Sequence, residues 1–430
     1  MKKLILKYLQ KTAKGIIEKH KPFIIGITGT VGKTTTTHFV FEFLQSIYGE
    51  EVYMSPYDYN GEYGLPLTIL QSKSPNKNIF GWINVFLKGF FLRFTSKYPK
   101  YLVLEYGIDH KGEMDTIIDV ASPDIGIILN IHKNHVEQFP DFQDYVEEKI
   151  KLARKSKKII YNIDDENIRS RISEITDRSI MSYGIKNQDI DIIAKNIKSD
   201  VNKLSFDFCY KNNCHMLEFG LIGEFQAYNI LPVFALGITL GVEIENIIDI
   251  IKNVNPQKGR GTLIQGMNKS IIIDGSYNGG ITSISAGVDY MSSLNNDYNK
   301  ILFLGDMREL GEESKKIHME LAEKIMLSNV DKVILVGEEM KKYIYEKMVK
   351  HFGEQNVYWF ASSRQAGLKI RSDIQKSERQ SVIFVKGSQN TIFLEEGIKE
   401  FIYDIRDISK LCRQSVHWMK IKENFFNNVL

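Results

Sequence analysis

The stretch KPFIIGITGTVGKTTTTHFVFEFL, residues 21–44, places an apolar run, a glycine-threonine turn and a lysine with four threonines ahead of a helical pattern. A turn between a buried strand and a helix suits phosphate, because backbone N–H groups converge at the positive end of the helix. We therefore predict that the N–H groups of Gly29 to Thr34 bind nucleotide phosphates, with Lys33 adding a charge and Thr34 a hydroxyl for Mg²⁺. Ile27 replaces the first glycine of the general GxxxxGK[ST] pattern, so the loop is a TGTxGKT variant.

The composition excludes several other classes of protein. A chain of 430 residues predicts two or three domains. Its net charge of +3, from 56 basic and 53 acidic residues, provides no basic stripe for a nucleic acid. The three cysteines, Cys209, Cys214 and Cys412, include no CxxC pair, which argues against a zinc site. Such sparse cysteine suits a reducing compartment, so we expect structural thiols and a cytoplasmic location.

Two segments in the first hundred residues are relevant to membranes. Residues 1–20 predict a short amphipathic helix, because lysines interrupt any signal-peptide core, and no run of 18 uncharged apolar residues occurs. Ile79 to Phe94 hold Trp82 and five phenylalanines beside only Lys88 and Arg93. This segment is either a core helix or hairpin insertion packed on its domain, or an interfacial or partner-binding surface.

Strand-like runs alternate with helical patterns from residue 21 onward, which indicates an α/β fold with parallel sheets. The alternation within residues 189–223 predicts antiparallel strands, followed by a helix near Gln226. We place a domain boundary near Lys258, which separates a first domain, 21–258, from a second, 259–430. The runs that predict strands are 23–27, 101–107, 125–131 and 157–164 in the first domain and 270–275, 301–306, 332–337 and 381–387 in the second.

Two side chains follow predicted strands near the phosphate loop. Glu105 ends the run YLVLE, and His135 comes just after IGIILNI. Because the carboxyl ends of parallel strands meet at one edge of a sheet, both lie on the same edge as the loop. A carboxylate and an imidazole there could complete a magnesium shell.

Several motifs in a fixed order resemble the Mur ligases, ATP-dependent amide-forming enzymes of cell-wall assembly, and most closely their MurF branch, which adds D-alanyl-D-alanine. The likeness runs from about residue 21 to about residue 396. It implies a central P-loop ATPase domain, a Rossmann-like C-terminal domain and ligation through an acyl phosphate. The motifs are TGTVGKTTT, NGEYGLPLT (60–68), EYGIDHKGEMD (105–115), NIHKNHVEQF (130–139), GRG (259–261), DGSYN (274–278), FLGDMRELGEES (303–314) and VKGS (385–388).

The resemblance also implies roles for individual residues. Lys149, fourteen residues after His135, occupies the position of the family's carbamylated lysine, which serves the second of two Mg²⁺ ions. Arg260 would clamp the transferred phosphate from the second domain, and Asp274 would hold the ribose. The implied metal set is Thr34, Glu105, His135 and Lys149; the implied ATP set is Gly29, Thr30, Gly32, Lys33, Thr34, Thr35, Gln226, Asn229, Arg260, Asp274, Tyr277 and Asn278.

The chain departs from the family pattern in places that concern its substrates. Phe225 and Gln226 replace a histidine and the asparagine that reads adenine, and Gln389 replaces an arginine. Gly279 to Ile281 replace the usual ANP. Two alternatives therefore stay open: a Mur-type ligase for another peptide, such as an archaeal wall peptide or a polyamino acid, and an ATP-binding partner subunit that does not ligate.

The phosphate loop lies early in the chain, with only about twenty residues before it. The family's UDP-binding N-terminal domain is thus expected to be missing. An aromatic insertion, residues 71–100, is the candidate replacement, with Trp82 and Phe86 at the acceptor. Its apolarity would fit a lipid-linked acceptor at a membrane surface. We expect a monomer that binds a peptide carboxylate and an amino acid or dipeptide.

Overall fold

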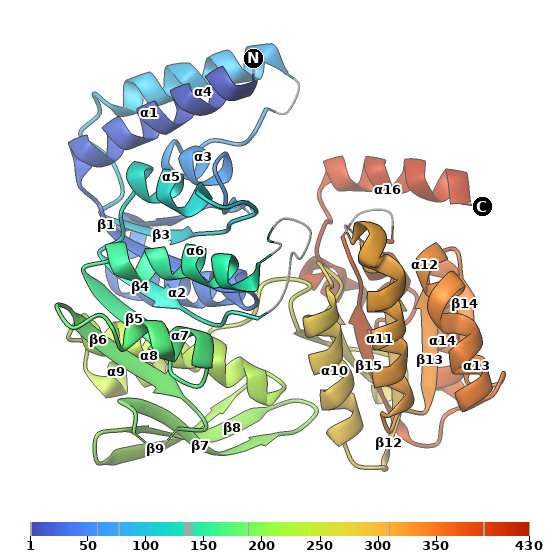
Figure 1. The fold of residues 1–430 in the computed structure, drawn as a ribbon. Coiled ribbons are helices and arrows are strands. Elements are labelled where there is room, and N and C mark those ends of the chain that lie inside the picture. The colour runs from blue at the N-terminus through green and yellow to red at the C-terminus, as the bar shows by residue number, and fades with distance from the viewer. Residues whose placement is uncertain are drawn as a thin grey trace. The chain divides into compact units, whose positions relative to one another are not determined.

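The computed structural model describes residues 2–57, 59–75, 78–132, 139, 141–187, 189–308, 310–389 and 392–429. The chain divides into two compact units, each with its own sheet (Figure 1). Unit 1 comprises Met1–Ile197, Ser205–Leu217 and Gln226–Val254, and unit 2 comprises Lys198–Leu204, Glu218–Phe225 and Asn255–Leu430. Both units mix helices with sheets that are mainly parallel, which confirms the predicted α/β class.

The sheet of unit 1 has the order β2-β3-β1-β4-β5-β6-β7-β8-β9. Every pairing from β2 through β7 is parallel. Short turns then join β7, β8 and β9, a connection that only antiparallel neighbours allow, as predicted for residues 189–223. The strands are β1 (Phe23–Thr28), β2 (Val52–Met54), β3 (Tyr101–Glu105), β4 (Ile125–Ile128), β5 (Lys158–Asn162), β6 (Ser179–Gly184), β7 (Ile192–Ser199), β8 (Leu204–Tyr210) and β9 (Asn213–Phe219).

Helices cover both faces of this sheet (Figure 1). On one face, α1, α3, α5 and α6 share a continuous buried core with β3 and β4. On the other, α2 and α8 pack so closely that a Cβ added at Gly237 would lie only 2.9 Å from the Phe43 ring. The predicted N-terminal helix is confirmed as α1. The helices of unit 1 are α1 (Lys2–His20), α2 (Lys33–Tyr48), α3 (Gly64–Ile69), α4 (Ile79–Leu92), α5 (Glu113–Val120), α6 (Phe142–Lys155), α7 (Glu166–Ile172), α8 (Ala227–Thr239) and α9 (Ile244–Ile251).

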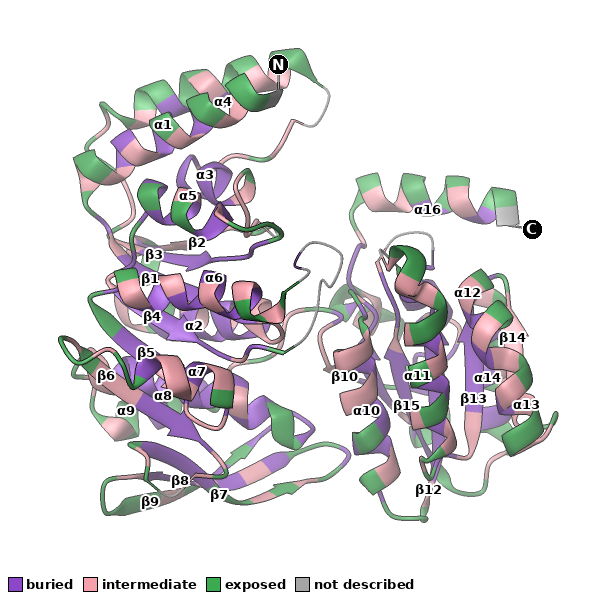
Figure 2. Cartoon of the chain, viewed as in Figure 1, coloured by how far each residue is buried: buried purple, intermediate pink, exposed green. Residues whose placement is uncertain are grey.

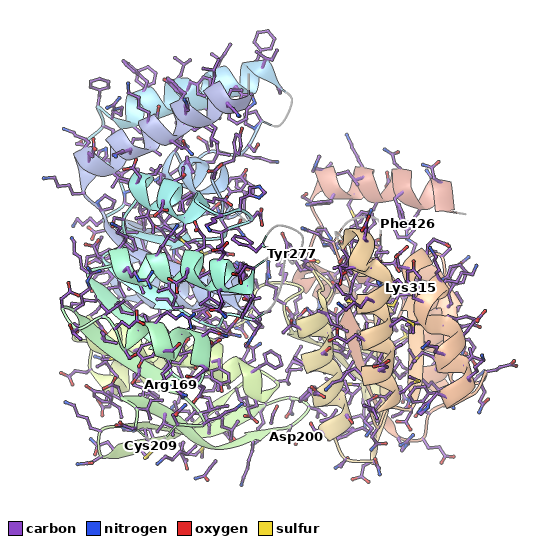
Figure 3. All side chains as sticks on the ribbon, viewed as in Figure 1. Arg169, Asp200, Cys209, Tyr277, Lys315 and Phe426 are labelled. Carbon is purple, nitrogen blue, oxygen red and sulfur yellow. A yellow bond between two sulfur atoms is a disulfide. The ribbon has the colours of Figure 1, made fainter. Side chains whose placement is uncertain are left out.

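A disulfide joins Cys209 to Cys214 across the turn between β8 and β9 (Figure 3). The expectation of three structural thiols was therefore wrong for these two residues. The hairpin register pairs cysteines that no CxxC motif marks, so their spacing alone carried no signal. Cys412 is a buried free thiol, and burial raises its pKa to about 12.

Unit 2 has a sheet of order β10-β11-β15-β12-β13-β14, in which only the β10–β11 pair is antiparallel. Separate apolar cores lie on its two faces, one with α10 and α11 and one with α14 and α15. Figure 2 shows its central strands buried. The elements are β10 (Thr262–Gln265), β11 (Ile271–Gly275), β12 (Tyr298–Gly305), β13 (Lys332–Val336), β14 (Val357–Phe360), β15 (Gln380–Lys386), α10 (Ile281–Ser293), α11 (Ser314–Met326), α12 (Glu338–Met340), α13 (Glu346–Phe352), α14 (Ser363–Lys376), α15 (Leu394–Ile398) and α16 (Val416–Val429).

Candidate functional site

The central strands of unit 1 bring the predicted site residues to one sheet edge. Strand β1 lies between β3 and β4, and the three are parallel, so their carboxyl ends coincide. The phosphate loop follows β1 and continues into α2. Glu105, the last residue of β3, is in register with Ile27. The loop and the carboxylate are therefore neighbours, as predicted from the strand ends.

Asn130, just after β4, supports the phosphate loop from behind. Its carbonyl accepts from the Thr30 N–H at 2.8 Å, and its side-chain oxygen accepts from the Val31 N–H at 2.9 Å. The prediction that all N–H groups from Gly29 to Thr34 face phosphate was therefore wrong for these two. The N–H groups of Thr34 and Thr35 lie in the first turn of α2, before the bond that the Thr36 N–H donates to the Gly32 carbonyl at 2.9 Å, and this position suits an anion.

Thr34 and Glu105 form the oxygen-rich part of this edge. The Thr34 hydroxyl donates to Glu105 Oε2 at 3.0 Å, and the Asn60 side-chain amide donates to Oε1 at 3.2 Å. Glu105 is only 8% exposed. A hydroxyl and a carboxylate are oxygen ligands of the kind that Mg²⁺ prefers, so the donor set fits this ion.

Lys149 lies buried on α6, behind the phosphate loop. Its side chain is only 1% exposed, and its Nζ lies over the Tyr145 ring, 4.8 Å from the centroid. The Tyr145 hydroxyl is 3.3 Å from the Thr30 hydroxyl, so Tyr145 links the loop to Lys149. Burial, together with the Lys33 ammonium, holds the pKa of Lys149 well below its usual range. The share of the neutral amine is thereby larger than for an exposed lysine.

Asn229, on α8, fixes the start of α2. Gly32 has a φ of +84°, and a Cβ there would lie 2.4 Å from Asn229 Oδ1. The same oxygen accepts from the Thr36 hydroxyl at 3.3 Å, and Asn229 Nδ2 donates to Gln226 Oε1 at 2.8 Å. Gln226 is 2% exposed. Both predicted nucleotide residues thus belong to the buried support of the loop, and the adenine role of Gln226 stays a prediction.

In unit 2, the loop that contains GRG packs against the loop that contains DGSYN. The Arg260 guanidinium lies over the Tyr277 ring, 4.5 Å from its centroid, and the Tyr277 N–H donates to the Gly259 carbonyl at 3.0 Å. Arg413 donates to the Ser276 and Tyr277 carbonyls at 2.8 and 2.9 Å. The Tyr277 ring thus orients the Arg260 guanidinium, and hydrogen bonds from Arg413 hold the loop that carries Tyr277.

Two ionisable groups next to that loop are Asp274, which is buried, and Lys386, which is partly buried. Asp274 is fully buried, its Oδ1 accepts from the Ser276 N–H at 2.9 Å, and burial raises its pKa to about 6. Its Oδ2 has no hydrogen-bond partner among the described residues. Lys386 donates to the Asn278 carbonyl at 3.0 Å, and burial with the Arg260 charge lowers its pKa to about 8. The ribose role implied for Asp274 stays a prediction.

Family models match both parts of the chain. The Mur ligase middle domain matches residues 27–237, and the glutamate ligase domain of Mur ligases matches residues 259–389. This chain belongs to the Mur ligase family. The resemblance inferred from the motifs is therefore confirmed, and the two matches fall on the two series of strands.

Three known proteins illustrate the likeness. A UDP-N-acetylmuramoyl-tripeptide–D-alanyl-D-alanine ligase of Borreliella burgdorferi is 29% identical over 331 residues, 76% of this chain and 64% of that relative. The chain thus spans less than two thirds of that relative's length. The fold matches MurF ligase from Thermotoga maritima in complex with ADP (TM-score 0.71, 20% identity, 97% of this chain and 84% of that one). It also matches a pseudomurein peptide ligase type C from Methanothermus fervidus (TM-score 0.64, 19% identity, 90% and 80%).

One predicted ligand of this Mur ligase chain, His135, lies outside the described residues. Among the residues that are described, no three histidine, cysteine or acidic side chains gather to hold a metal. The predicted metal set is therefore represented by Thr34 and Glu105, with Lys149 buried nearby.

Sequence reasoning missed several residues that position this site. Asn130 and Lys386 lie within motifs that were recognised, but their contacts are to loops 99 and 108 residues away. Tyr145 lies one helical turn before Lys149 on α6, a spacing that could have indicated a shared face. Asn60, in the NGEYGLPLT motif, gave no sign that it would bind Glu105.

Proposed function

We propose that this Mur ligase chain is an ATP-dependent ligase that joins a carboxylate of a cell-wall peptide precursor to an amino acid or dipeptide, with D-alanyl-D-alanine as the incoming amine. The observation that carries the proposal is the assembly of Lys33, Thr34 and Glu105 at one sheet edge, with Lys149 buried beside them. We place this activity in the cytoplasm, where ATP is available.

The chemistry follows from the charges involved. A substrate carboxylate attacks the γ-phosphate of ATP, ADP leaves, and the resulting acyl phosphate is attacked by the amine, which releases phosphate and a proton. Both the attacking group and ATP are anionic, so the step needs positive charge at the phosphates. Lys33 and the α2 N-terminus provide it in unit 1. Magnesium, held by Thr34 and Glu105, would neutralise phosphate charge further.

The proposal includes a covalent modification of Lys149. Its lowered pKa increases the share of the neutral amine, which is the form that combines with carbon dioxide. We infer that Lys149 is carbamylated and that the carbamate oxygens, hard ligands, serve the second of two Mg²⁺ ions. Its burial supports this inference because a permanently charged ammonium would be costly there.

The activity is tested with Lys33→Ala. Phosphate release with D-alanyl-D-alanine is measured against a panel of UDP-linked, lipid-linked and free peptide carboxylates. We expect Lys33→Ala to abolish acceptor-dependent ADP formation without lowering the melting temperature, because this lysine lines the loop rather than the core. The control is Lys157→Ala, an exposed lysine whose side chain is 79% accessible. Unchanged turnover in Lys33→Ala would reject the nucleotide assignment.

The same panel separates the alternatives. Release with an archaeal wall peptide or a polyamino acid among the free carboxylates, but not with muramyl peptides, would identify a Mur-type ligase for another peptide. ATP binding without release for any acceptor would favour the non-ligating subunit. The substitutions at Gln226 and Gln389 are the sequence features that keep both alternatives in the experiment.

Carbamylation of Lys149 is tested independently of turnover. With ¹³C-bicarbonate, we expect a carbamate carbon signal in the parent and in Lys155→Ala, an exposed position on the same helix, but none in Lys149→Ala. Lys149→Ala should also be severely slow and partly rescued by a short carboxylic acid, while Lys149→Arg should not be rescued. Full activity in bicarbonate-free buffer, with no carbamate signal, would refute the inference.

A further inference from the structure

Helix α4 exposes an apolar stripe along one side. The stripe consists of side chains that are between 47% and 79% exposed, and the positions recur at helical spacing within an arc of roughly 120°. Phe90 lies 5.9 Å from Phe91 and 5.0 Å from Phe94, so the rings form a continuous surface. The stripe residues are Ile79, Phe80, Ile83, Leu87, Phe90 and Phe91 of α4, together with Phe94 just after the end of the helix.

The opposite side of α4 packs against α1 and the core of unit 1, so the helix that carries the stripe is a folded part of that unit. Trp82 and Phe86 are half-buried against the core of unit 1, and Phe86 lies 4.6 Å from the Tyr8 ring of α1. A Cβ at Gly89 would lie 2.7 Å from Thr12, which shows how closely α1 and α4 approach. Trp82 and Phe86, which were expected at the acceptor, thus pack against unit 1 with part of their surface, and a role at an acceptor stays a prediction. The exposed rings belong to other positions.

Helix α1 extends the exposed surface with basic residues. Leu4 is 73% and Tyr8 43% exposed, and the exposed Lys3, Lys7 and Lys11 continue the same outer side of the helix. Figure 2 shows exposed residues recurring along both helices. An apolar stripe flanked by lysines is the pattern of a helix that lies in the plane of a membrane interface.

The charge of this region is opposite to that of the remaining chain. Residues 1–21 hold seven lysines and one acidic residue, and residues 63–104 hold six basic residues and no acidic residue. These two segments therefore carry +12, whereas the whole chain carries +3. The rest of the chain has a net charge of −9, the difference between these two values. The two segments that contain α1 and α4 therefore carry the positive excess of the chain.

We propose that the outer face of α1 and α4 docks on the surface of an anionic phospholipid bilayer. With 14 residues, α4 is too short to span a bilayer, and none of the described helices combines the length and apolarity needed to do so. The stripe would enter the headgroup boundary while the lysines contact anionic headgroups. A second copy of this chain is disfavoured as the occupant, because two such basic faces would repel each other.

The experiment is co-sedimentation of the full chain with vesicles of phosphatidylcholine alone or enriched in phosphatidylglycerol. We expect binding to the anionic vesicles that weakens as salt is raised, and little binding to the neutral ones. Phe80→Ser with Phe91→Ser should weaken binding more than a hundredfold, since each buried ring contributes about 1.5–3 kcal/mol. Lys3→Gln, Lys7→Gln and Lys11→Gln together should weaken it about a hundredfold, at about 1 kcal/mol per lysine.

The controls change equally exposed residues elsewhere. Leu327→Ser alters an apolar side chain that is 86% exposed, and Lys315→Gln, Lys316→Gln and Lys376→Gln remove the same charge from unit 2. Both controls should bind like the parent. If the serine variants melt early, the lysine variant decides, because its positions are on the surface.

Three results would overturn the proposal. The first is a parent that fails to bind anionic vesicles, and the second is α1 and α4 variants that bind as well as the controls. The third is a vesicle-free dimer, detected by sedimentation velocity, that dissociates in Phe80→Ser with Phe91→Ser. That result would assign the face to a second copy instead.

Discussion

Gly32 combines two constraints that a side chain would violate. Its φ of +84° lies in the left-handed region, and Asn229 Oδ1 occupies the space where a Cβ would be. Gly112 has a nearly identical φ of +88°, also as the N-cap of a helix, but among the described residues no atom beyond its chain neighbours lies within 4 Å of the position of a Cβ there. Comparing substitutions at Gly32 and Gly112 therefore separates the cost of backbone strain from the cost of crowding against Asn229.

We expect Gly112→Ala to cost about 1–2 kcal/mol, the strain of a left-handed residue alone. Gly32→Ala should cost more and should also raise the KM for ATP, because the start of α2 must move away from Asn229. Urea unfolding and ADP-formation kinetics measure the two effects. Adding Asn229→Ala should restore part of the ATP affinity to Gly32→Ala. Equal losses in the two single variants would show that crowding at Gly32 is unimportant.

Residue-scale prediction succeeded where a contact is local or fixed by strand ends. The phosphate loop and Glu105 were placed from consecutive residues and the parallel-sheet rule. The residues that support the loop were not predicted, because Asn130 lies 99 residues from Val31 in sequence and Asn229 lies 193 residues from Thr36. Nothing in a local pattern specifies such a partner.

At the scale of elements, α16 is anchored by a buried charge. Lys422 is fully buried and contacts Glu395 at 2.9 Å and Glu396 at 2.8 Å. Burial raises the pKa of Glu396, but hydrogen bonds from Lys399 and Lys422 more than offset this, so its pKa is lower than usual. Removing one cation from such a cluster leaves buried carboxylates whose negative charge is no longer fully neutralised.

Lys422→Met should therefore destabilise unit 2 by about 3–5 kcal/mol. The control is Lys203→Met, which breaks an ion pair between half-exposed side chains and should cost less than about 1 kcal/mol. Because the depressed pKa of Glu396 stabilises the fold only above the unfolded value, the parent loses this stability as the pH falls through the folded pKa. The difference between parent and Lys422→Met should shrink in acid. A constant difference across pH in urea titrations would contradict the assignment.

Strands were predictable from the sequence where both faces of the strand are buried, because such a strand is a continuous run of apolar residues. Such runs predicted β1, β3, β11 and β12. The edge strands β2 and β14 were missed, since each has a single buried residue and hence no such run. For α4, the aromatic content was evident, but the choice between Trp82 and Phe80 as the outer ring depends on its packing against α1.

At the scale of the whole molecule, each unit has a sheet and an apolar core of its own. Leu104 lies in the core of unit 1 and is 2% exposed; Leu302 lies in a core of unit 2 and is fully buried. The sequence predicted two series of strands, but residues 198–204 and 218–225 belong to the second unit although they fall within the predicted first domain. Short segments that leave one unit for another give no compositional signal.

If each core stabilises only its own unit, calorimetry should resolve two unfolding transitions. Leu104→Ala should lower one of them and Leu302→Ala the other, because a buried leucine contributes about 2–5 kcal/mol. For units of this size, such a loss corresponds to a shift of several degrees. Leu327→Ala, at an exposed position, should move neither transition. A single transition that Leu104→Ala and Leu302→Ala lower equally would mean that the two cores unfold as one cooperative system, and the division into units would then describe geometry but not stability.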